Sequence, residues 1–215
     1  MFKLKLPANA LFVGVTNSGK SHLLKCIMGL HMDFFNYGVV FSSTCFNGAY
    51  NFINDEYIYE DYDEQIVKNI MQKQRDNVEA AQKDQTLKIP ECFIIIDDNL
   101  GLLELHAKRN LFDILFAKSR HLHISIFLCI QSCSYLSTCI RANSVYVFIT
   151  VVKNSSIKMM YEVSRGFKSE KQFVEYLDKN CHDYRIVMFD NTNAYKNFTK
   201  IIKAPEKIPE FHMEY

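Results

Sequence analysis

Neither sign of charge dominates this chain of 215 residues, and none of its apolar stretches is long. It has 25 Lys and Arg against 24 Asp and Glu, which gives a formal net charge of +1. That balance excludes a surface that is basic all over, so contact with nucleic acid would need a local patch or an assembled ring. The longest apolar stretches, near residues 124–130 and 145–152, are far shorter than the roughly 20 residues of a membrane-spanning helix. We therefore expect no membrane segment.

Cysteine pairs and repeats are also missing, and we expect no leader sequence. No two of the seven cysteines have C-x-x-C spacing, and Cys26, Cys92 and Cys129 lie on apolar faces, so we expect reduced thiols in a cytosolic protein. Residues 1–6 lack the apolar core of a signal peptide. Tryptophan is absent, but 48 % of the residues are hydrophobic, with Phe and Tyr as bulky core residues. The chain is predicted to form one domain, 1–215, ending in a tail from about residue 200.

One motif stands out, and it is predicted to bind phosphate. Its residues are Gly14-Val15-Thr16-Asn17-Ser18-Gly19-Lys20-Ser21, which fit the P-loop pattern G-x-x-x-x-G-K-[ST]. A buried strand is expected just before the motif, at 10–13, and a helix just after it, with Leu23, Leu24, Ile27 and Met28 on its apolar face. Glycines let the backbone wrap around phosphates, and the helix N-terminus adds free N–H groups.

Within this loop, two side chains are predicted to have separate roles. Lys20 would neutralise the β- and γ-phosphates of a nucleotide, and Ser21 would ligate Mg²⁺. Gly14, Thr16, Asn17, Ser18 and Gly19 would cradle the phosphates. His22 either borders the same site or only caps the helix and faces solvent. The alternative for the whole motif is a glycine turn before a core helix.

A pair of carboxylates is predicted to complete the site. The apolar run 92–96 is typical of a central parallel strand, and it ends in Asp97-Asp98. Side chains at the carboxyl end of such a strand face the ligand crevice. Asp97 is then placed to hold the Mg²⁺ shell, and Asp98 to orient or deprotonate the attacking water. The alternative for Asp98 is a helix N-cap or a loop carboxylate.

The order of the remaining patterns predicts an α/β fold. Further strands are expected at 38–42, 124–130, 146–152 and 185–189, and helices at 64–88, around 111–116, near 157–163 and after a capping box at 169–172. Residues 44–63 are polar, aromatic and acidic, and we expect an excursion on the surface. Alternating strands and helices give a mostly parallel sheet flanked by helices, with the P-loop and both aspartates at one edge.

Four passages together resemble a known superfamily. They are the P-loop, residues 95–98, the segment 119–125 that contains Arg120, and the segment from Gln131 to Asn143 that contains Arg141. This combination resembles the FtsK/HerA superfamily of ring-shaped DNA translocases, and within it the DNA-packaging ATPases of poxviruses, giant viruses and virophages. Residues 50–53 are also similar to the packaging enzymes. The matches spread over roughly two thirds of the chain.

The resemblance implies residue roles on a RecA-like core. Lys20, Ser21, Asp97 and Asp98 keep the roles given above, and Gln131 becomes a sensor of the γ-phosphate. Arg120 and Arg141 are both candidates for an arginine finger that acts across a subunit boundary, Arg141 from a loop braced by Asn143. Many superfamily members have Asp-Glu at the acid pair, whereas this chain has Asp-Asp. The shorter second acid must then lie closer to the water or act through another one.

The resemblance also implies cofactors and partners. We expect ATP and Mg²⁺ as cofactors, double-stranded DNA as substrate, a homo-oligomeric ring (a pentamer or hexamer), and a capsid or portal-vertex protein as partner, in the host cytoplasm, the viral factory or the virion. Preference for ATP over GTP rests on the resemblance alone. Lys108-Arg109 either touches DNA in a central pore or is a solvated charge pair. The rival functions are a nucleoside or nucleotide kinase and a nucleotide-dependent scaffold without hydrolysis.

Overall fold

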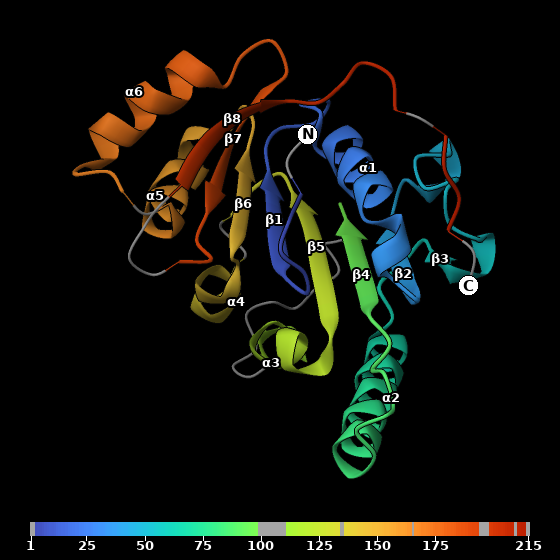
Figure 1. Ribbon diagram of the computed structural model, residues 1–215. Helices are drawn as coiled ribbons and strands as arrows, with labels where there is room; N and C mark the ends of the chain where they lie inside the picture. The colour runs from blue at the N-terminus through green and yellow to red at the C-terminus, as the bar shows by residue number, and fades with distance from the viewer. Residues whose placement is uncertain are drawn as a thin grey trace.

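Eight strands form a single sheet in the computed structural model, which describes residues 3–98, 111–133, 136–164, 166–193, 198–208 and 210–213. Their order across the sheet is β3-β2-β4-β5-β1-β6-β7-β8 (Figure 1). All neighbouring pairs from β3 to β6 are parallel, whereas β7 and β8 are antiparallel to their neighbours. The strands are β1 Asn9–Val13, β2 Tyr37–Ser42, β3 Ile58–Tyr59, β4 Cys92–Asp97, β5 Ile124–Ile130, β6 Tyr146–Ile149, β7 Arg185–Asp190 and β8 Phe198–Lys203.

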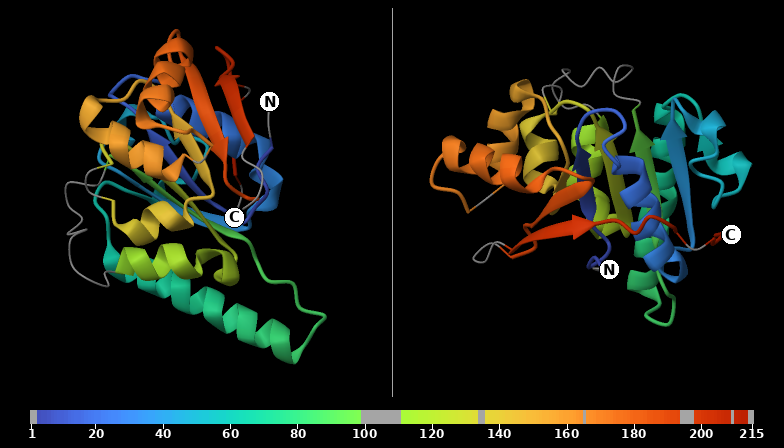
Figure 2. Two further views of the ribbon diagram at one scale, coloured as in Figure 1. Left: turned by 90° about the vertical axis from the view of Figure 1, so that its left-hand side faces the viewer. Right: turned by 90° about the horizontal axis from the view of Figure 1, so that it is seen from above.

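Helices cover both faces of the sheet (Figure 2). Helix α1, Lys20–Leu30, packs on one face together with residues from the fifties and from the C-terminal segment. Among the described residues, the other face carries the helices α2 Glu64–Lys83, α3 Leu111–Lys118, α4 Thr138–Asn143, α5 Asn154–Val163 and α6 Glu170–Asn180. Short 3₁₀ turns lie at η1 Met32–Phe34, η2 Cys45–Asn47, η3 Asp55–Tyr57 and η5 Ser119–Leu122. The predicted α/β class with a mostly parallel, helix-flanked sheet is confirmed.

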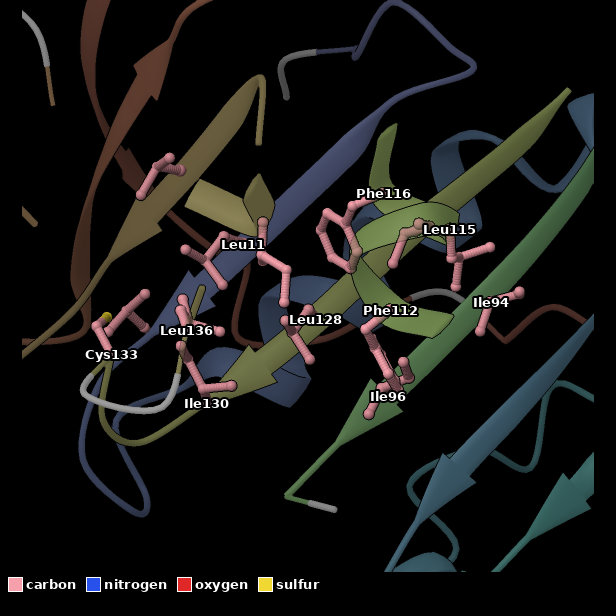
Figure 3. Packing of buried hydrophobic residues seen from close by; sticks show 14 of the residues in the cluster. Leu11, Ile94, Ile96, Phe112, Leu115, Phe116, Leu128, Ile130, Cys133 and Leu136 are labelled. Atoms are coloured by element: carbon pink, nitrogen blue, oxygen red, sulfur yellow. The ribbon is translucent and has the colours of Figure 1, made fainter. Parts of the chain in front are cut away.

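The central strands are apolar throughout because both of their sides are covered. In β4, Ile94 and Ile96 belong to one core cluster, while Phe93 and Ile95 belong to the other. Figure 3 shows α3 above the first of these clusters, with its side chains directed at β4 and β5. Successive residues of a strand point to opposite faces of the sheet. Because both faces are covered, every residue of β4 and β5 faces a core, which explains the continuous apolar runs that predicted these strands.

The segment 44–63 lies largely at the surface, as expected, but three of its residues anchor it to the core. Tyr50, Phe52 and Ile53 are almost fully buried against α1. The ring of Phe52 packs 4.7 Å from that of Phe211, and the Phe52 carbonyl accepts a hydrogen bond from the Met213 backbone N–H. Burial of these side chains therefore fixes the segment on the core, although its sequence has no regular period.

The C-terminal region also differs from the expected tail. Residues 198–203 form β8, which pairs antiparallel with β7, so β7 is not the last strand. Elsewhere the differences are small: the helix predicted to reach residue 88 ends at Lys83, and the strand predicted to reach residue 152 ends at Ile149. The box at Ser169 caps α6 as predicted, because Ser169 Oγ accepts from the Gln172 N–H.

The sequence predicted reduced cysteines and no membrane-spanning segment. All seven cysteines have free thiols, as expected from their spacing. Over the ranges that the structure describes, none of the helices combines the length and apolar character that crossing a membrane requires.

Candidate nucleotide and catalytic site

The P-loop connects the end of β1 to the start of α1. Two of its glycines are needed where they are: a Cβ on Gly14 would lie 1.6 Å from Thr150 Oγ1, and Gly19 has a φ of +92°. Thr150 Oγ1 donates to Ser18 Oγ at 2.7 Å and so ties the loop to the strand beside it. The N-terminus of α1 has no side-chain cap and no acidic residue in its first turn. Its free N–H groups suit an anion such as a phosphate.

Lys20 is buried at the start of α1, with only 6 % of its surface exposed. Its Nζ donates hydrogen bonds to the carbonyls of Gly14 and Val15, at 2.9 and 3.0 Å. An ammonium group has three N–H bonds. The loop's own backbone therefore fixes the position of this cation and leaves one donor for a ligand.

Asp97 lies at the end of β4 and receives two hydrogen bonds on one oxygen. Ser21 Oγ donates to Asp97 Oδ2 at 2.9 Å, which joins the P-loop to the acid pair as the sequence predicted. Tyr50 Oη donates to the same oxygen at 2.6 Å. Burial raises the pKa of Asp97, and the two hydrogen bonds oppose that rise. Burial, and the nearby Asp97 carboxylate, also raise the pKa of Tyr50 well above its usual value, so Tyr50 stays a donor.

Tyr50 is the site residue that sequence reasoning missed. Its neighbourhood was noted only as part of a resemblance, within a segment expected at the surface. A tyrosine between small and polar residues has no periodic signal, and its contact with Asp97 spans 47 positions in the sequence. Only the packing of Phe52 and Ile53 under α1 shows that this segment reaches the site.

The oxygens around Asp97 fit a divalent cation. Asp97 Oδ1 is buried and has no hydrogen-bond partner within the described part of the chain. A buried carboxylate oxygen without a partner is costly. The Asp97 carboxylate and the Ser21 hydroxyl that contacts it are hard oxygen donors of the kind that Mg²⁺ takes beside nucleotide phosphates, with water completing its shell.

Asp98 and Gln131 meet at the same edge of the sheet. Asp98 follows β4 with a left-handed φ of +53°, and Gln131 follows β5, the neighbouring parallel strand. Gln131 Nε2 donates to Asp98 Oδ1 at 3.2 Å. Asp98 is less buried than Asp97, and among the described residues no hydrogen bond engages its second oxygen, which suits a donor such as a water molecule. The geometry thus brings the predicted second acid and the predicted sensor into contact.

A cleft of about 870 Å³ opens beside these residues. Residues 16–22 of the P-loop, Asp97 and Asp98 line it, with Tyr184 and residues 203–206 further along. His22 borders the cleft, and its Nε2 donates to the Pro205 carbonyl at 2.6 Å. The cleft has the size of a small-molecule site.

The two candidate arginines lie apart from this cleft. Arg120 is on η5, directly before β5, and Arg141 is on the short helix α4 rather than in the expected loop. Arg141 donates to the Leu136 carbonyl at 2.5 Å and lies 3.6 Å from a carboxylate oxygen of Glu162. Arg120 is exposed, and no hydrogen bond or ion pair engages its guanidinium in the described ranges.

Two other predictions from the sequence concern Asn143 and the pair Lys108-Arg109. Asn143 does donate to a backbone carbonyl, that of Cys139, but it braces α4 rather than a loop. Lys108 and Arg109 lie outside the described residues.

Comparison with solved structures identifies the fold. The chain is similar to the genome packaging NTPase B204 from Sulfolobus turreted icosahedral virus 2 in complex with ATP-γ-S, with a TM-score of 0.66 at 14 % identity over 94 % of this chain and 100 % of that one. It is also similar to B204, the DNA-packaging ATPase from Sulfolobus turreted icosahedral virus, with a TM-score of 0.63 at 16 % identity over 93 % and 98 % of the two chains. At these identities the likeness concerns the fold, which is that of P-loop NTPases.

Comparison of sequences identifies the family. An uncharacterized protein of Acanthamoeba polyphaga mimivirus, L437, is 26 % identical over 196 residues, which are 88 % of this chain and 69 % of that protein. The family model described as Poxvirus A32 protein matches residues 3–200. The chain therefore belongs to the Poxvirus A32 protein family, as the resemblance to the poxvirus type predicted, and it shares the fold of the B204 protein.

Proposed function

We propose that this chain is a Mg²⁺-dependent ATPase that moves double-stranded DNA and packages a viral genome into its capsid. The observation that carries the proposal is the contact between two motifs far apart in sequence: Ser21 of the P-loop donates to Asp97 of the acid pair. That contact completes the donor set for a nucleotide with its cation. Membership of the Poxvirus A32 protein family and the B204 fold support the packaging role.

The residues divide the hydrolysis of ATP between them. Lys20 and the free N–H groups of α1 bind the β- and γ-phosphates, and Ser21 and Asp97 would hold Mg²⁺, which neutralises phosphate charge. Asp98 positions a water molecule and accepts its proton while the water oxygen bonds to the γ-phosphorus. The bond to the bridging oxygen breaks, and ADP and inorganic phosphate leave. Gln131 holds Asp98 and reports the loss of the γ-phosphate to β5.

The rest of the proposal concerns assembly. A chain with a net charge of +1 attracts DNA weakly by itself, so we propose a ring, a pentamer or hexamer, that collects local basic patches around a central duplex. The ring would act at a capsid or portal vertex in the host cytoplasm or viral factory. Nucleotide bound at a subunit boundary would stabilise the ring by mass action.

A steady-state ATPase assay with and without duplex DNA, beside a screen of phosphate acceptors, tests the proposal. We expect Mg²⁺-dependent release of phosphate that duplex DNA stimulates, and no transfer to nucleosides or nucleotides. Transfer to an acceptor would instead identify a kinase, and nucleotide binding without turnover a scaffold. Lys20→Ala should remove the activity, by at least about 10²–10³-fold, because it deletes the buried cation that faces the phosphates. Lys68→Ala, which removes an exposed lysine of α2, is the matched control.

A further inference from the structure

The nucleotide cleft extends beyond the P-loop to an exposed tyrosine. Tyr184 lies between α6 and β7, lines the cleft and has 69 % of its surface exposed. Its ring is close to the last glycine of the P-loop, because a Cβ on Gly19 would lie 3.6 Å from Tyr184 Cδ1. The ring therefore stands next to the place where phosphates would enter the N-terminus of α1.

The backbone holds Tyr184 in a conformation that tyrosine seldom adopts. The Arg185 N–H donates to the His182 carbonyl at 2.9 Å and closes a tight turn. Both central residues are left-handed, with φ of +51° at Asp183 and +58° at Tyr184. Such turns favour Gly, Asn or Asp at these positions, and a bulky side chain there is an outlier. The exposure of the ring shows that burial does not compensate for the strain, which points to a ligand instead.

A second wall faces the same part of the cleft. Residues 203–206, at the end of β8 and just after it, line the cleft with Tyr184. Lys203 pairs in register with Arg185, the residue after Tyr184, so β8 brings this wall beside the turn. The hydrogen bond from His22 to the Pro205 carbonyl fastens the wall to α1. Ala204 and Pro205 give it apolar surface, while Lys203 and Glu206 give it charge.

We propose that Tyr184 stacks on the base of the bound nucleotide and that residues 203–206 form the other side of the base site. This inference rests on the proposed function, because the same nucleotide places its phosphates on the P-loop. A planar base that lies between the Tyr184 ring and the apolar side chains of Ala204 and Pro205 buries both of its faces. Stacking on an aromatic ring is possible for every base. Selection among bases would then fall to polar groups of the wall, such as those of Lys203 and Glu206.

Titration calorimetry on the full chain with Mg²⁺, using ATP and inorganic tripolyphosphate as the two ligands, tests the base site. Tyr184→Gly removes the ring and suits the left-handed turn, so its melting temperature should stay the same or rise. We expect this variant to bind ATP roughly 5- to 100-fold more weakly and tripolyphosphate as tightly as the unchanged chain does. Tyr184→Phe keeps a ring and should keep the affinity for ATP. Phe198→Ala, at an exposed aromatic residue of β8 outside the cleft lining, should change neither.

Two results would overturn the base site. One is unchanged ATP affinity in Tyr184→Gly, and the other is an equal loss for ATP and tripolyphosphate, which would mean that the ring only supports the P-loop. The proposed function fails by a different result, namely an unchanged chain that binds ATP but does not hydrolyse it with or without duplex DNA. An unchanged chain that binds neither ligand would refute both.

Discussion

The two edges of the sheet differ in how completely one chain can build a catalytic site there. At the carboxyl edge of the parallel strands, Lys20 and Asp97 line one cleft, and Gln131 at the end of β5 contacts Asp98, which also lines it. At the opposite edge, Arg120 and Arg141 each lie a few residues before a strand, β5 and β6 respectively. The seven residues of β5 separate the edges by about 20 Å, at about 3.3 Å per residue.

This separation has a consequence for the arginine finger. An arginine side chain is much shorter than the strands, so neither Arg120 nor Arg141 reaches the cleft of its own chain. If the site uses an arginine finger, we expect that arginine to come from a neighbouring copy of the chain. Asn9, the first residue of β1, holds the amino edge together: its side chain donates to the Asn143 carbonyl and accepts from Ser119 Oγ. The strand that carries the P-loop thus also holds both arginine-bearing segments.

The two arginines also differ from each other. The hydrogen bond to Leu136 and the ion pair with Glu162 engage Arg141 within its own chain, and only 17 % of its side chain is exposed. Arg120 is exposed and keeps its donors free among the described residues. To reach the site of a neighbouring subunit, the Arg141 side chain would have to break these contacts. Arg120 has no such contacts among the described residues. We therefore expect Arg120 to be the finger.

The largest effect that we predict follows from this comparison. Arg120→Ala should lower DNA-stimulated turnover by roughly 10³–10⁵-fold, the range for arginine fingers in related NTPases, and leave ATP binding intact. Mixing Arg120→Ala chains with Lys20→Ala chains should restore part of the activity. Each mixed boundary can pair an intact P-loop with an intact arginine, and phosphate release measures the recovery.

Arg141→Ala is the matched control for that experiment. It should keep most of the turnover, because its contacts lie within the chain. If Arg141→Ala lost the activity and recovered it on mixing, while Arg120→Ala did neither, the finger would be Arg141. If neither variant recovered although rings formed, the site would be complete in one chain and the comparison of the two edges would be wrong.

The second prediction separates the two acids of the carboxyl edge. Asp98→Asn should reduce turnover by about 10²–10⁴-fold, the usual contribution of a general base, and bind Mg²⁺-ATP normally. Asp97→Asn should weaken Mg²⁺-dependent binding as well, since Asp97 carries the buried oxygen that suits the cation. Binding titrations with and without Mg²⁺ distinguish the variants. Identical behaviour would contradict this division of roles.

The carboxyl edge could be predicted from sequence for a clear physical reason. The P-loop, Asp97-Asp98 and Gln131 each follow an apolar run, and parallel strands bring their carboxyl ends to one edge. Once the strands were assigned, the meeting of these residues followed. The same reasoning placed Arg120 next to its strand, but it predicted a loop around Arg141, where Ser137 caps a short helix instead.

Two contributions to the cleft could not be predicted in this way. Tyr50 reaches Asp97 through an irregular segment that only its burial against α1 holds in place. Residues 198–203 have no continuous apolar run, because β8 lies at the edge of the sheet and is largely exposed. Both depend on contacts between distant residues, which a local period does not encode. The base site that we propose lies beside β8, so the sequence pattern could not predict it either.

The third prediction tests whether Tyr50 positions Asp97. Tyr50→Phe keeps the buried ring and removes one hydrogen bond, so turnover should fall about 10–100-fold, as for residues that orient metal ligands. Because that hydrogen bond lowers the pKa of Asp97, its loss should raise this pKa and move the acidic limb of the pH–rate profile to higher pH. Tyr57→Phe, in η3, is the control. An unshifted acidic limb would limit Tyr50 to packing.

The smallest predicted effect concerns stability, and it should have opposite signs at the two edges. Burial raises the pKa of Asp97, so the folded chain binds this proton more tightly than the unfolded chain, whose pKa is about 3.9. Stability of the nucleotide-free chain therefore falls as the pH rises from that value through the raised pKa. At neutral pH the ionised Asp97 costs free energy, and Asp97→Asn removes that cost with almost no change of shape.

We accordingly expect Asp97→Asn to raise the melting temperature of the nucleotide-free chain at pH 7 by roughly 2–4 °C, which corresponds to about 1 kcal/mol in a domain of this size. The gain should shrink toward pH 4, where the carboxyl becomes protonated. Arg141→Met, at the other edge, should lower the melting temperature by a similar amount, because it leaves the Leu136 carbonyl without its donor. Thermal unfolding followed by circular dichroism measures both. If Asp97→Asn lowered the melting temperature instead, the Asp97 carboxylate would stabilise the fold. The proposed cation site would then not reduce the stability of the nucleotide-free chain.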